Sequence, residues 1–381
     1  MIKIDKPIIY LDNAATTPLL DPVKEVMTNT FAAYGNPSSL YQIGQDANKI
    51  IEDSRESIAD YIGCSPQEII FESCGSEANT HALFSTYDYA QAHGLGNHII
   101  ASKIEHHSIL AACEYLRTYR GAAVTYLDVD KDGFIDIHQL EKSINLNTCL
   151  ISIMAANNEV GTIQNIKEIK RIADAYGLIF HSDCVQLFGH APLHIDDIDL
   201  FSMSGHKIGA PKGIGLLFIK HTTPILPYIF GTQERGLRGG TQNTAYIAAL
   251  AEAVRQLPAS QDDVRKLSDY MRNRILAEIP GVWLNGPMDE NRLANNLNFS
   301  FAGIRGEELM ILLDMYGICV STGSACNSSS GESSHVLTAM GLTNDEADSS
   351  IRISFSPQNT IKEIDFTVNR MKELINQLRS R

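Results

Sequence analysis

The chain has 381 residues, of which 44% are hydrophobic, and its 31 Lys and Arg against 45 Asp and Glu give a formal net charge of −14. This composition excludes a disordered chain, and the negative charge argues against broad binding to nucleic acid or to an anionic membrane. No apolar run reaches the roughly 18 residues of a membrane span, and the N-terminus lacks the apolar core of a signal peptide. We therefore expect a globular, cytoplasmic protein.

Short β-rich runs alternate with helix-like segments between residues 68 and 256. In chain order we expect strands at 68–71, 98–101, 123–127, 149–154, 178–181, 199–203 and 214–219, and helices at 76–92, 107–119, 163–176 and 244–256. Such alternation predicts an α/β fold with a mostly parallel sheet flanked by helices. Beyond about residue 260 the pattern changes to a long helix at 264–279, a strand, a helix, a strand and a terminal helix near 361–378. This second pattern predicts a smaller α+β domain.

Polar residues follow the first two predicted strands. The turn SCGSEAN at 73–79 places Gly75 and Ser76 where a helix begins. Free backbone N–H groups at such a position bind anions, so the turn is a candidate phosphate site. The alternative is simple helix capping by Ser76. His106 follows the next strand and could stack on an aromatic ring, or it could be an ordinary capping histidine.

Three further polar residues follow later strands of the same predicted sheet. Asn157 lies in MAANNEVG, Asp183 in FHSDCVQ and Lys207 in SGHK. In open parallel sheets, ligands bind at the carboxyl ends of the strands. Pyridoxal phosphate requires a lysine for its Schiff base and an acid for its pyridine nitrogen, so Lys207 and Asp183 point to that cofactor. The alternative is an exposed loop lysine near an N-cap aspartate.

Two residues in the C-terminal part also stand out. Arg352 lies within an apolar strand, SSIRISF, where a guanidinium needs an anionic partner such as a substrate carboxylate; a structural salt bridge is the alternative. Cys326 lies in the polar stretch STGSACNSSSGESS, where we expect an accessible thiol. None of the seven cysteines forms a CxxC pair, so no zinc ribbon and no thioredoxin-type motif is indicated.

Together these motifs carry a family resemblance. The chain resembles cysteine desulfurases of the NifS/IscS group, which belong to the fold-type I, class V aminotransferase-like pyridoxal-phosphate enzymes. The match extends nearly end to end, through YLDNAATTP, GNPSS, FESCGSEAN, EHHSIL, NNEVGTIQ, HSDCVQ, SGHK, PKGIG, ERGLRGGT, STGSAC and SSIRISF. The resemblance implies a large cofactor-binding domain at 15–260 and a small domain, formed by 1–14 and 261–381, that carries a catalytic cysteine.

The resemblance also implies roles for individual residues in binding pyridoxal phosphate. Lys207 resembles the Schiff-base lysine, and Asp183 resembles the partner of the pyridine nitrogen. The remaining cofactor contacts implied are His106 on the ring, Gln186 beside the ring hydroxyl, Asn157, and Gly75, Ser76, Ser204 and His206 around the phosphate. Thr241 resembles a threonine that the second subunit donates to the same phosphate, which implies a homodimer. The family's ESDN-type stretch is EANT here, which leaves Asn79 and Thr80 without a role.

The implied activity is a cysteine desulfurase. L-cysteine would bind through Arg352 and Asn157, with Asn36 close by, and would leave as L-alanine. Cys326 would become a persulfide, with Lys207 and His106 as proton carriers. The sulfur would pass to an acceptor protein in iron–sulfur cluster assembly, tRNA thiolation or DNA phosphorothioation. The alternative is a class V aminotransferase or a cysteine lyase that uses the same site without a persulfide.

Overall fold

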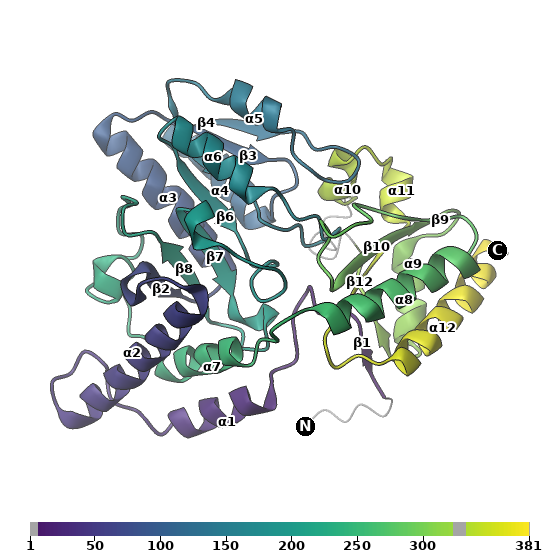
Figure 1. Ribbon diagram of the computed structural model, residues 1–381, viewed down its shortest axis with the longest axis horizontal. Coiled ribbons are helices and arrows are strands. Elements are labelled where there is room, and N and C mark those ends of the chain that lie inside the picture. The colour runs from purple at the N-terminus through teal and green to yellow at the C-terminus, as the bar shows by residue number, and fades with distance from the viewer. Residues whose placement is uncertain (1–6, 323–332, 381) are drawn as a thin grey trace.

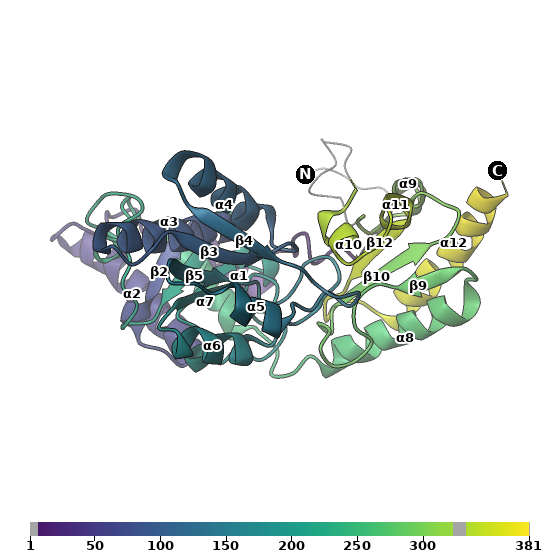
Figure 2. The ribbon, with the colours of Figure 1, turned by 90° about the horizontal axis from the view of Figure 1, so that it is seen from above.

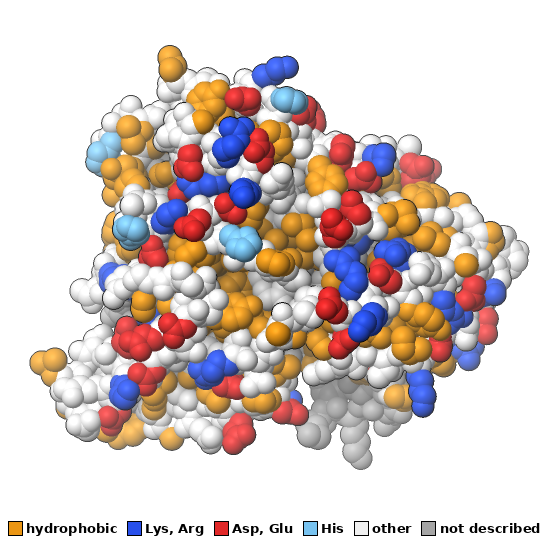
Figure 3. Space-filling model, in the orientation of Figure 1, with side chains coloured by type: hydrophobic (Ala, Val, Ile, Leu, Met, Phe, Trp, Pro, Cys, Tyr) orange, Lys and Arg blue, Asp and Glu red, His pale blue; other side chains and the backbone are white. Residues whose placement is uncertain are grey.

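The computed structural model describes residues 7–322 and 333–380 (Figure 1). A larger part, built on a central sheet, lies beside a smaller part that contains the C-terminal helices (Figure 2). No helix within the described ranges is long and apolar enough to span a bilayer. On the face shown in Figure 3, basic and acidic side chains are interspersed.

A mixed seven-stranded sheet forms the centre of the larger part. In spatial order its strands are β2 (Ile69–Glu72), β8 (Gly215–Ile219), β7 (Leu200–Ser204), β6 (Ile179–Asp183), β5 (Thr148–Ser152), β3 (His98–Ser102) and β4 (Ala123–Leu127). The five strands from β7 to β4 pair in parallel, whereas β8 runs antiparallel to both of its neighbours. The predicted α/β fold with a mostly parallel sheet is confirmed.

Helices cover both faces of this sheet because successive strand residues point to opposite sides. Ile99 and Leu217 belong to an apolar core with residues of α3 and α4. The adjoining residues Ile100 and Phe218 belong to a second core with residues of α2, α6 and α7. The helices of this part are α1 (Asp21–Thr30), α2 (Gln42–Ile62), α3 (Gly75–His93), α4 (His107–Arg120), α5 (Ile137–Ser143), α6 (Ile166–Ala175) and α7 (Thr244–Arg255).

The smaller part has its own apolar core around an antiparallel sheet. Its strands are β9 (Val282–Leu284), β10 (Asn296–Phe301) and β12 (Ser350–Ser354), and its helices are α8 (Asp262–Glu278), α9 (Gly306–Asp314), α10 (His335–Ala339), α11 (Asn344–Asp348) and α12 (Ile361–Arg379). β1 (Ile9–Tyr10) pairs in parallel with β11 (Ile318–Cys319), so the N-terminal strand lies beside the C-terminal part.

Five helices within the described ranges have no counterpart among the predicted elements: α1, α2, α5, α10 and α11. In α1 only Val23 is buried, and in α5 only Leu140, so neither helix has a wide apolar stripe. In α2 the stripe exists, because Ala47, Ile51 and Ile58 recur at helical spacing and are buried. The helical signal of α2 was thus present in the sequence, whereas α1 and α5 depend on packing against the rest of the fold.

Candidate active site

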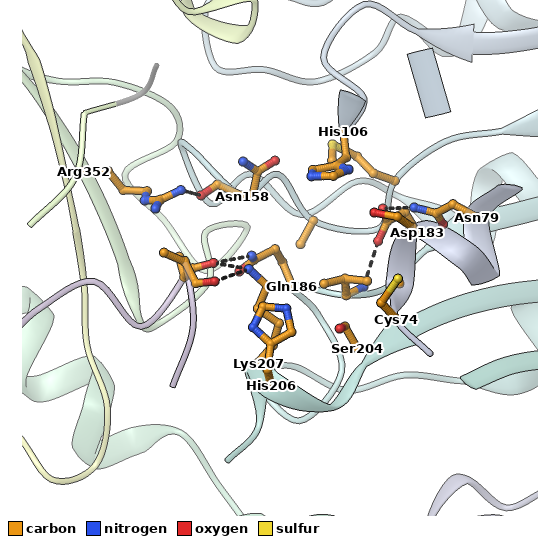
Figure 4. Close-up of a pocket in the computed structure, with 17 residues that line it drawn as sticks. Cys74, Asn79, His106, Asn158, Asp183, Gln186, Ser204, His206, Lys207 and Arg352 are labelled. Atoms are coloured by element: carbon orange, nitrogen blue, oxygen red, sulfur yellow. Dashed lines mark hydrogen bonds between the residues drawn. The ribbon is translucent and has the colours of Figure 1, made fainter. Parts of the chain in front are cut away.

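A cavity of about 350 Å³ opens at the carboxyl ends of β6 and β7 (Figure 4). It is lined by nine of the thirteen predicted site residues, although they are scattered from residue 75 to residue 352. These are Gly75, Ser76, His106, Asp183, Gln186, Ser204, His206, Lys207 and Arg352. The strand ends, the N-terminus of α3 and the smaller part therefore form one site.

Lys207 lies in a short 3-10 turn, Gly205–Lys207, directly after β7. Its Nζ donates hydrogen bonds to the carbonyl oxygens of Ala14 at 2.6 Å and Ala15 at 2.9 Å. The Nε2 of Gln186 donates to the same Ala14 oxygen at 3.0 Å. The backbone N–H of Ala14 in turn donates to the Oγ of Ser354 at 2.8 Å. The lysine amine is thus held where the larger and the smaller parts of the chain meet.

Asp183 is the last residue of β6, and its side chain is buried. One carboxylate oxygen accepts from the Nδ2 of Asn79 at 2.7 Å, and the other accepts from the backbone N–H of Val185 at 2.9 Å. These two donors orient the carboxylate in the cavity wall. Asn79 is a site residue that the motif analysis left without a role. The position of Asn79 could have indicated its role, because it lies one helical turn after Gly75, on the same face of α3.

His106 both lines the cavity and caps α4. Its Nδ1 accepts from the backbone N–H of Ser108 at 3.2 Å and lies 2.8 Å from the Oγ of that serine. Burial lowers the pKa of His106, the nearby Asp183 raises it, and Lys207 lowers it. Since the shift is downward, the imidazole is neutral at pH 7. An acceptor role for Nδ1 places its proton on Nε2. His106 therefore caps α4 and also lines the cavity.

The start of α3 has the features of an anion site. A Cβ on Gly75 would lie only 2.7 Å from the Cγ2 of Val185, so the backbone and the cavity wall approach too closely for a side chain. Cys74 caps the helix, because its Sγ accepts from the backbone N–H of Glu77 at 3.4 Å. Ser76 is consequently not the cap that the alternative interpretation assumed. The remaining first-turn N–H groups can bind a phosphate.

Burial and two nearby lysines lower the pKa of His206 to about 4. Its imidazole is therefore neutral at pH 7. Its Nδ1 lies 3.1 Å from the Oγ1 of Thr16. Together with Ser204 at the end of β7, it provides neutral hydrogen-bonding groups opposite the start of α3 (Figure 4).

The structure corrects the expectation for Asn157. This side chain is fully buried outside the cavity wall, where its Nδ2 donates to the carbonyl oxygen of Ile104 at 3.1 Å. Its Oδ1 accepts from the backbone N–H groups of Glu159 at 2.8 Å and Val160 at 3.0 Å. The neighbouring Asn158 lines the cavity instead. Because two consecutive asparagines follow the strand, the sequence pattern could not indicate which of them lines the cavity.

Arg352 extends from β12 to the opposite wall (Figure 4). Its Nη2 pairs with the Oδ1 of Asp12 at 2.8 Å, and its Nη1 donates to the carbonyl oxygen of Asn158 at 3.1 Å. Within the part of the chain that the structure describes, the buried Nε has no partner. Arg352 therefore forms the structural salt bridge of the alternative interpretation, and its guanidinium still has N–H groups available to a ligand at the cavity.

Two predicted residues lie elsewhere, and one lies outside the described residues. Asn36 and Thr241 line a separate surface hollow of about 260 Å³, together with Tyr34 and Gln242. Cys326 belongs to the stretch 323–332, which is outside the described ranges. Among the described residues, no group of three or more His, Cys, Asp or Glu side chains is arranged to hold a metal ion.

Comparison with known proteins identifies the family. The class-V aminotransferase model matches residues 9–366. Cysteine desulfurase IscS of Dictyoglomus turgidum is 42% identical over 380 residues, which cover 98% of this chain and 95% of that protein. The chain belongs to the cysteine desulfurase family. Cysteine desulfurase IscS of Methanosarcina thermophila is 41% identical, with 100% and 95% of the two chains covered.

Solved structures of the family share the fold. A NifS-like protein superposes with a TM-score of 0.90 at 36% identity, and the match covers 97% of this chain and 100% of that one. A structure described as SspA in complex with cysteine has a TM-score of 0.82 at 35% identity, with 92% and 99% covered. The predicted family and fold class are thus confirmed, and enzymes of this family depend on pyridoxal phosphate.

The residues of the cavity fit this cofactor. An amine, a buried carboxylate and a helix N-terminus lie in one space of about 350 Å³, and they match the aldehyde, the pyridine nitrogen and the phosphate. The close approach at Gly75 leaves the backbone N–H groups of α3 open to the phosphate oxygens. The buried Asn79 Oδ1, which has no partner among the described residues, adds an unused acceptor beside Asp183.

Proposed function

We propose that this chain converts L-cysteine to L-alanine and keeps the sulfur as a persulfide on Cys326. The observation that carries the proposal is the meeting of Lys207, Asp183 and Arg352 in one cavity. The overall change balances, because the thiol of Cys326 and L-cysteine become a persulfide and L-alanine. The Cβ–S bond of the substrate breaks, an S–S bond forms, and no external oxidant is needed.

Each wall of the cavity would hold one part of the cofactor. Lys207 would bind it covalently through Nζ, Asp183 would hold the pyridine nitrogen, and His106 would lie against the ring. The start of α3 would hold the phosphate with Ser204 and His206. When bound, pyridoxal phosphate supplies an electron sink for the bond electrons released at the substrate Cα.

The remaining groups would act on the substrate. Arg352 would bind the carboxylate of L-cysteine through its remaining donors, while Asp12 and Asn158 hold the guanidinium in place. The Nζ of Lys207, as a neutral amine, would accept the Cα proton. The neutral His106 would take the thiol proton of Cys326 on Nδ1, its unprotonated ring nitrogen, so that a thiolate attacks the substrate sulfur.

We further propose that the active enzyme is a homodimer with Thr241 of each chain at the phosphate of the other. This proposal is supported by the position of Thr241 in an exposed hollow, away from Lys207. Large apolar side chains near this region are exposed, including Phe31, Tyr34 and Phe230. Such residues are typical of a surface that a second copy covers.

The acceptor of the sulfur would be a protein of iron–sulfur cluster assembly, tRNA thiolation or DNA phosphorothioation. A protein intermediary is favoured because the net charge of −14 opposes direct contact with nucleic acid. We place the enzyme in the cytoplasm, where thiols stay reduced; the six described cysteines are all free.

Replacement of Cys326 tests the proposal. Cys326→Ser holoenzyme should retain the cofactor absorbance and its change on adding L-cysteine, because Lys207 and Asp183 are intact. Alanine and sulfide formation should fall to background, and the gain of one sulfur mass on the Cys326 peptide should vanish. Cys64→Ser is the matched control, since Cys64 is a half-buried cysteine outside the cavity lining, and it should retain turnover. Wild-type sulfide release by Cys326→Ser would instead favour the lyase alternative.

A further inference from the structure

The short helix α10 begins three residues after the stretch 323–332 that carries Cys326. Its five residues are too few to be stable as an isolated helix, so its position depends on tertiary contacts. Those contacts are made with the larger part of the chain, at the segment that carries His106 and at the loop that carries Glu159. We call them the α10 junction: Ser334 and His335 on one side, and Glu105, His107 and Glu159 on the other.

His335 makes the first half of the α10 junction. Its Nε2 lies 3.0 Å from the carbonyl oxygen of Glu105, the residue that precedes His106. Because a carbonyl can only accept, Nε2 is the donor. The ring also lies against the ring of His107, with centroids 4.6 Å apart. Burial lowers the pKa of His335, so the imidazole is neutral at pH 7.

Ser334 makes the second half. Its Oγ caps α10 by accepting from the backbone N–H of Leu337 at 3.1 Å, and it donates to the buried Oε2 of Glu159 at 2.5 Å. The backbone of Glu159 is itself held by the Oδ1 of Asn157. The role of Asn157 is therefore to support the loop that receives Ser334.

A small apolar core joins the same two parts of the chain. Ile104, Met154 and Val160 of the larger part pack with Val336 and Leu337 of α10. The other flank of the 323–332 stretch is also held at the cavity, because the backbones of Ser321 and Arg352 exchange hydrogen bonds of 3.1 and 2.7 Å. Both flanks of the stretch are thus bonded to residues that line the cavity or adjoin its lining.

From this arrangement we infer that Ser334 and His335 are positioning residues for sulfur transfer: they hold the C-terminal flank of the Cys326 stretch against the His106 loop. The inference rests on the proposed function, because it concerns where Cys326 is presented. It requires no contact of Ser334 or His335 with cofactor or substrate. Loss of the α10 junction should therefore slow formation of the persulfide while substrate binding at Lys207 is retained.

Single-turnover measurements on the holoenzyme test this role. His335→Ala removes both the hydrogen bond and the ring contact, and it should slow the appearance of the Cys326 persulfide by about 10-fold, as misplacement of a reacting group does. The cofactor absorbance change on adding L-cysteine should keep its wild-type rate and amplitude. His335→Gln can still donate to the Glu105 oxygen, so it should recover part of the rate. His138→Ala, on the exposed face of α5, is the matched control.

His107→Ala removes the ring contact from the other side and leaves α10 unchanged. It should slow persulfide formation in the same direction as His335→Ala, and it keeps the test available if that variant does not fold. Equal slowing of the absorbance change and of persulfide formation would mean a general structural defect and would overturn the inference. Wild-type persulfide rates in both variants would also overturn it. Absence of a persulfide in the wild-type enzyme would overturn the proposed function itself.

Discussion

The cavity around Lys207 and the hollow around Thr241 differ in how their polar side chains are held. In the cavity, Asp183 and Lys207 are held by described hydrogen bonds from the same chain. In the hollow, Asn36 and Thr241 are exposed. Groups of the chain itself orient the side chains at the cavity, whereas the hollow presents polar groups outward. This difference agrees with the proposed homodimer, in which Thr241 serves the cavity of the second chain.

The hollow is joined to the buried Glu234, because the Nε2 of Gln242, which lines the hollow, donates to the Oε1 of Glu234 at 3.1 Å. Glu234 and Arg235, which precede Thr241, have φ angles of 45° and 58°, a strained conformation for residues other than glycine. The buried Glu234 carboxylate holds them in place, since it accepts from Arg55 at 2.8 and 2.9 Å and from the backbone N–H of Phe71 at 3.0 Å. The exposed segment that leads to Thr241 is thus held by the buried ion pair between Arg55 and Glu234.

The largest expected effect comes from the cavity. Lys207→Ala should abolish covalent cofactor binding and reduce alanine formation by at least about 10³-fold, because the same amine binds the cofactor and carries the proton. Absorbance after borohydride treatment measures the covalent link. Lys362→Ala removes an exposed lysine of α12 and should behave like wild type. A reducible link retained at another lysine in Lys207→Ala would contradict the assignment.

The second effect concerns the support of the hollow. Glu234→Gln removes the buried charge partner of Arg55, and breaking a buried ion pair in this way costs about 3–5 kcal/mol in the free energy of unfolding. Urea denaturation measures the loss. Glu52→Gln is the matched control, because Glu52 contacts the same arginine at 3.3 Å but is half exposed; it should cost less than about 1 kcal/mol. Equal losses in the two variants would show that burial of Glu234 is not what matters.

The third effect concerns Glu159 of the α10 junction and depends on pH. Burial raises the pKa of Glu159 from 4.5 to about 7. The folded state therefore binds this proton more tightly than the unfolded state. The stabilisation that the protonated Glu159 gives to the folded state is complete below about pH 4.5 and is lost as the pH rises through 7. Glu159→Gln should remove this part of the pH dependence, a change of about 2–3 kcal/mol in the difference between unfolding free energies at pH 4.5 and 7.5. Parallel pH profiles for the two proteins would contradict it.

The two regions could be predicted from the sequence to different extents. Asp183 and Lys207 could be predicted as site residues because each follows a β-rich run, and the carboxyl ends of parallel strands lie at one edge of a sheet. Asn79 was missed because its role depends on meeting Asp183 across 104 residues. The Arg55–Glu234 pair joins residues 179 apart and has no local signal at all. Strand ends can be inferred from local pattern, whereas pairings between elements require the packed structure.

The smallest expected effect tests whether the hollow belongs to a second copy of the site. Thr241→Ala removes one hydroxyl donor to a charged group, worth about 1.5–3 kcal/mol, so cofactor affinity should fall by roughly 10- to 100-fold. Gln67→Ala, an exposed polar truncation away from the cavity and the hollow, should leave that affinity unchanged.

Mixing the Thr241→Ala and Lys207→Ala proteins then decides which chain the threonine serves. If Thr241 reaches the phosphate of its partner, each hybrid dimer has one site with both defects and one site with neither, so activity should rise above that of either parent. If Thr241 served its own cavity, every site in the hybrid would carry one defect and mixing would restore nothing. Native mass spectrometry verifies that subunits have exchanged. A lack of recovery after verified exchange would therefore mean that the hollow and the cavity belong to the same chain's site.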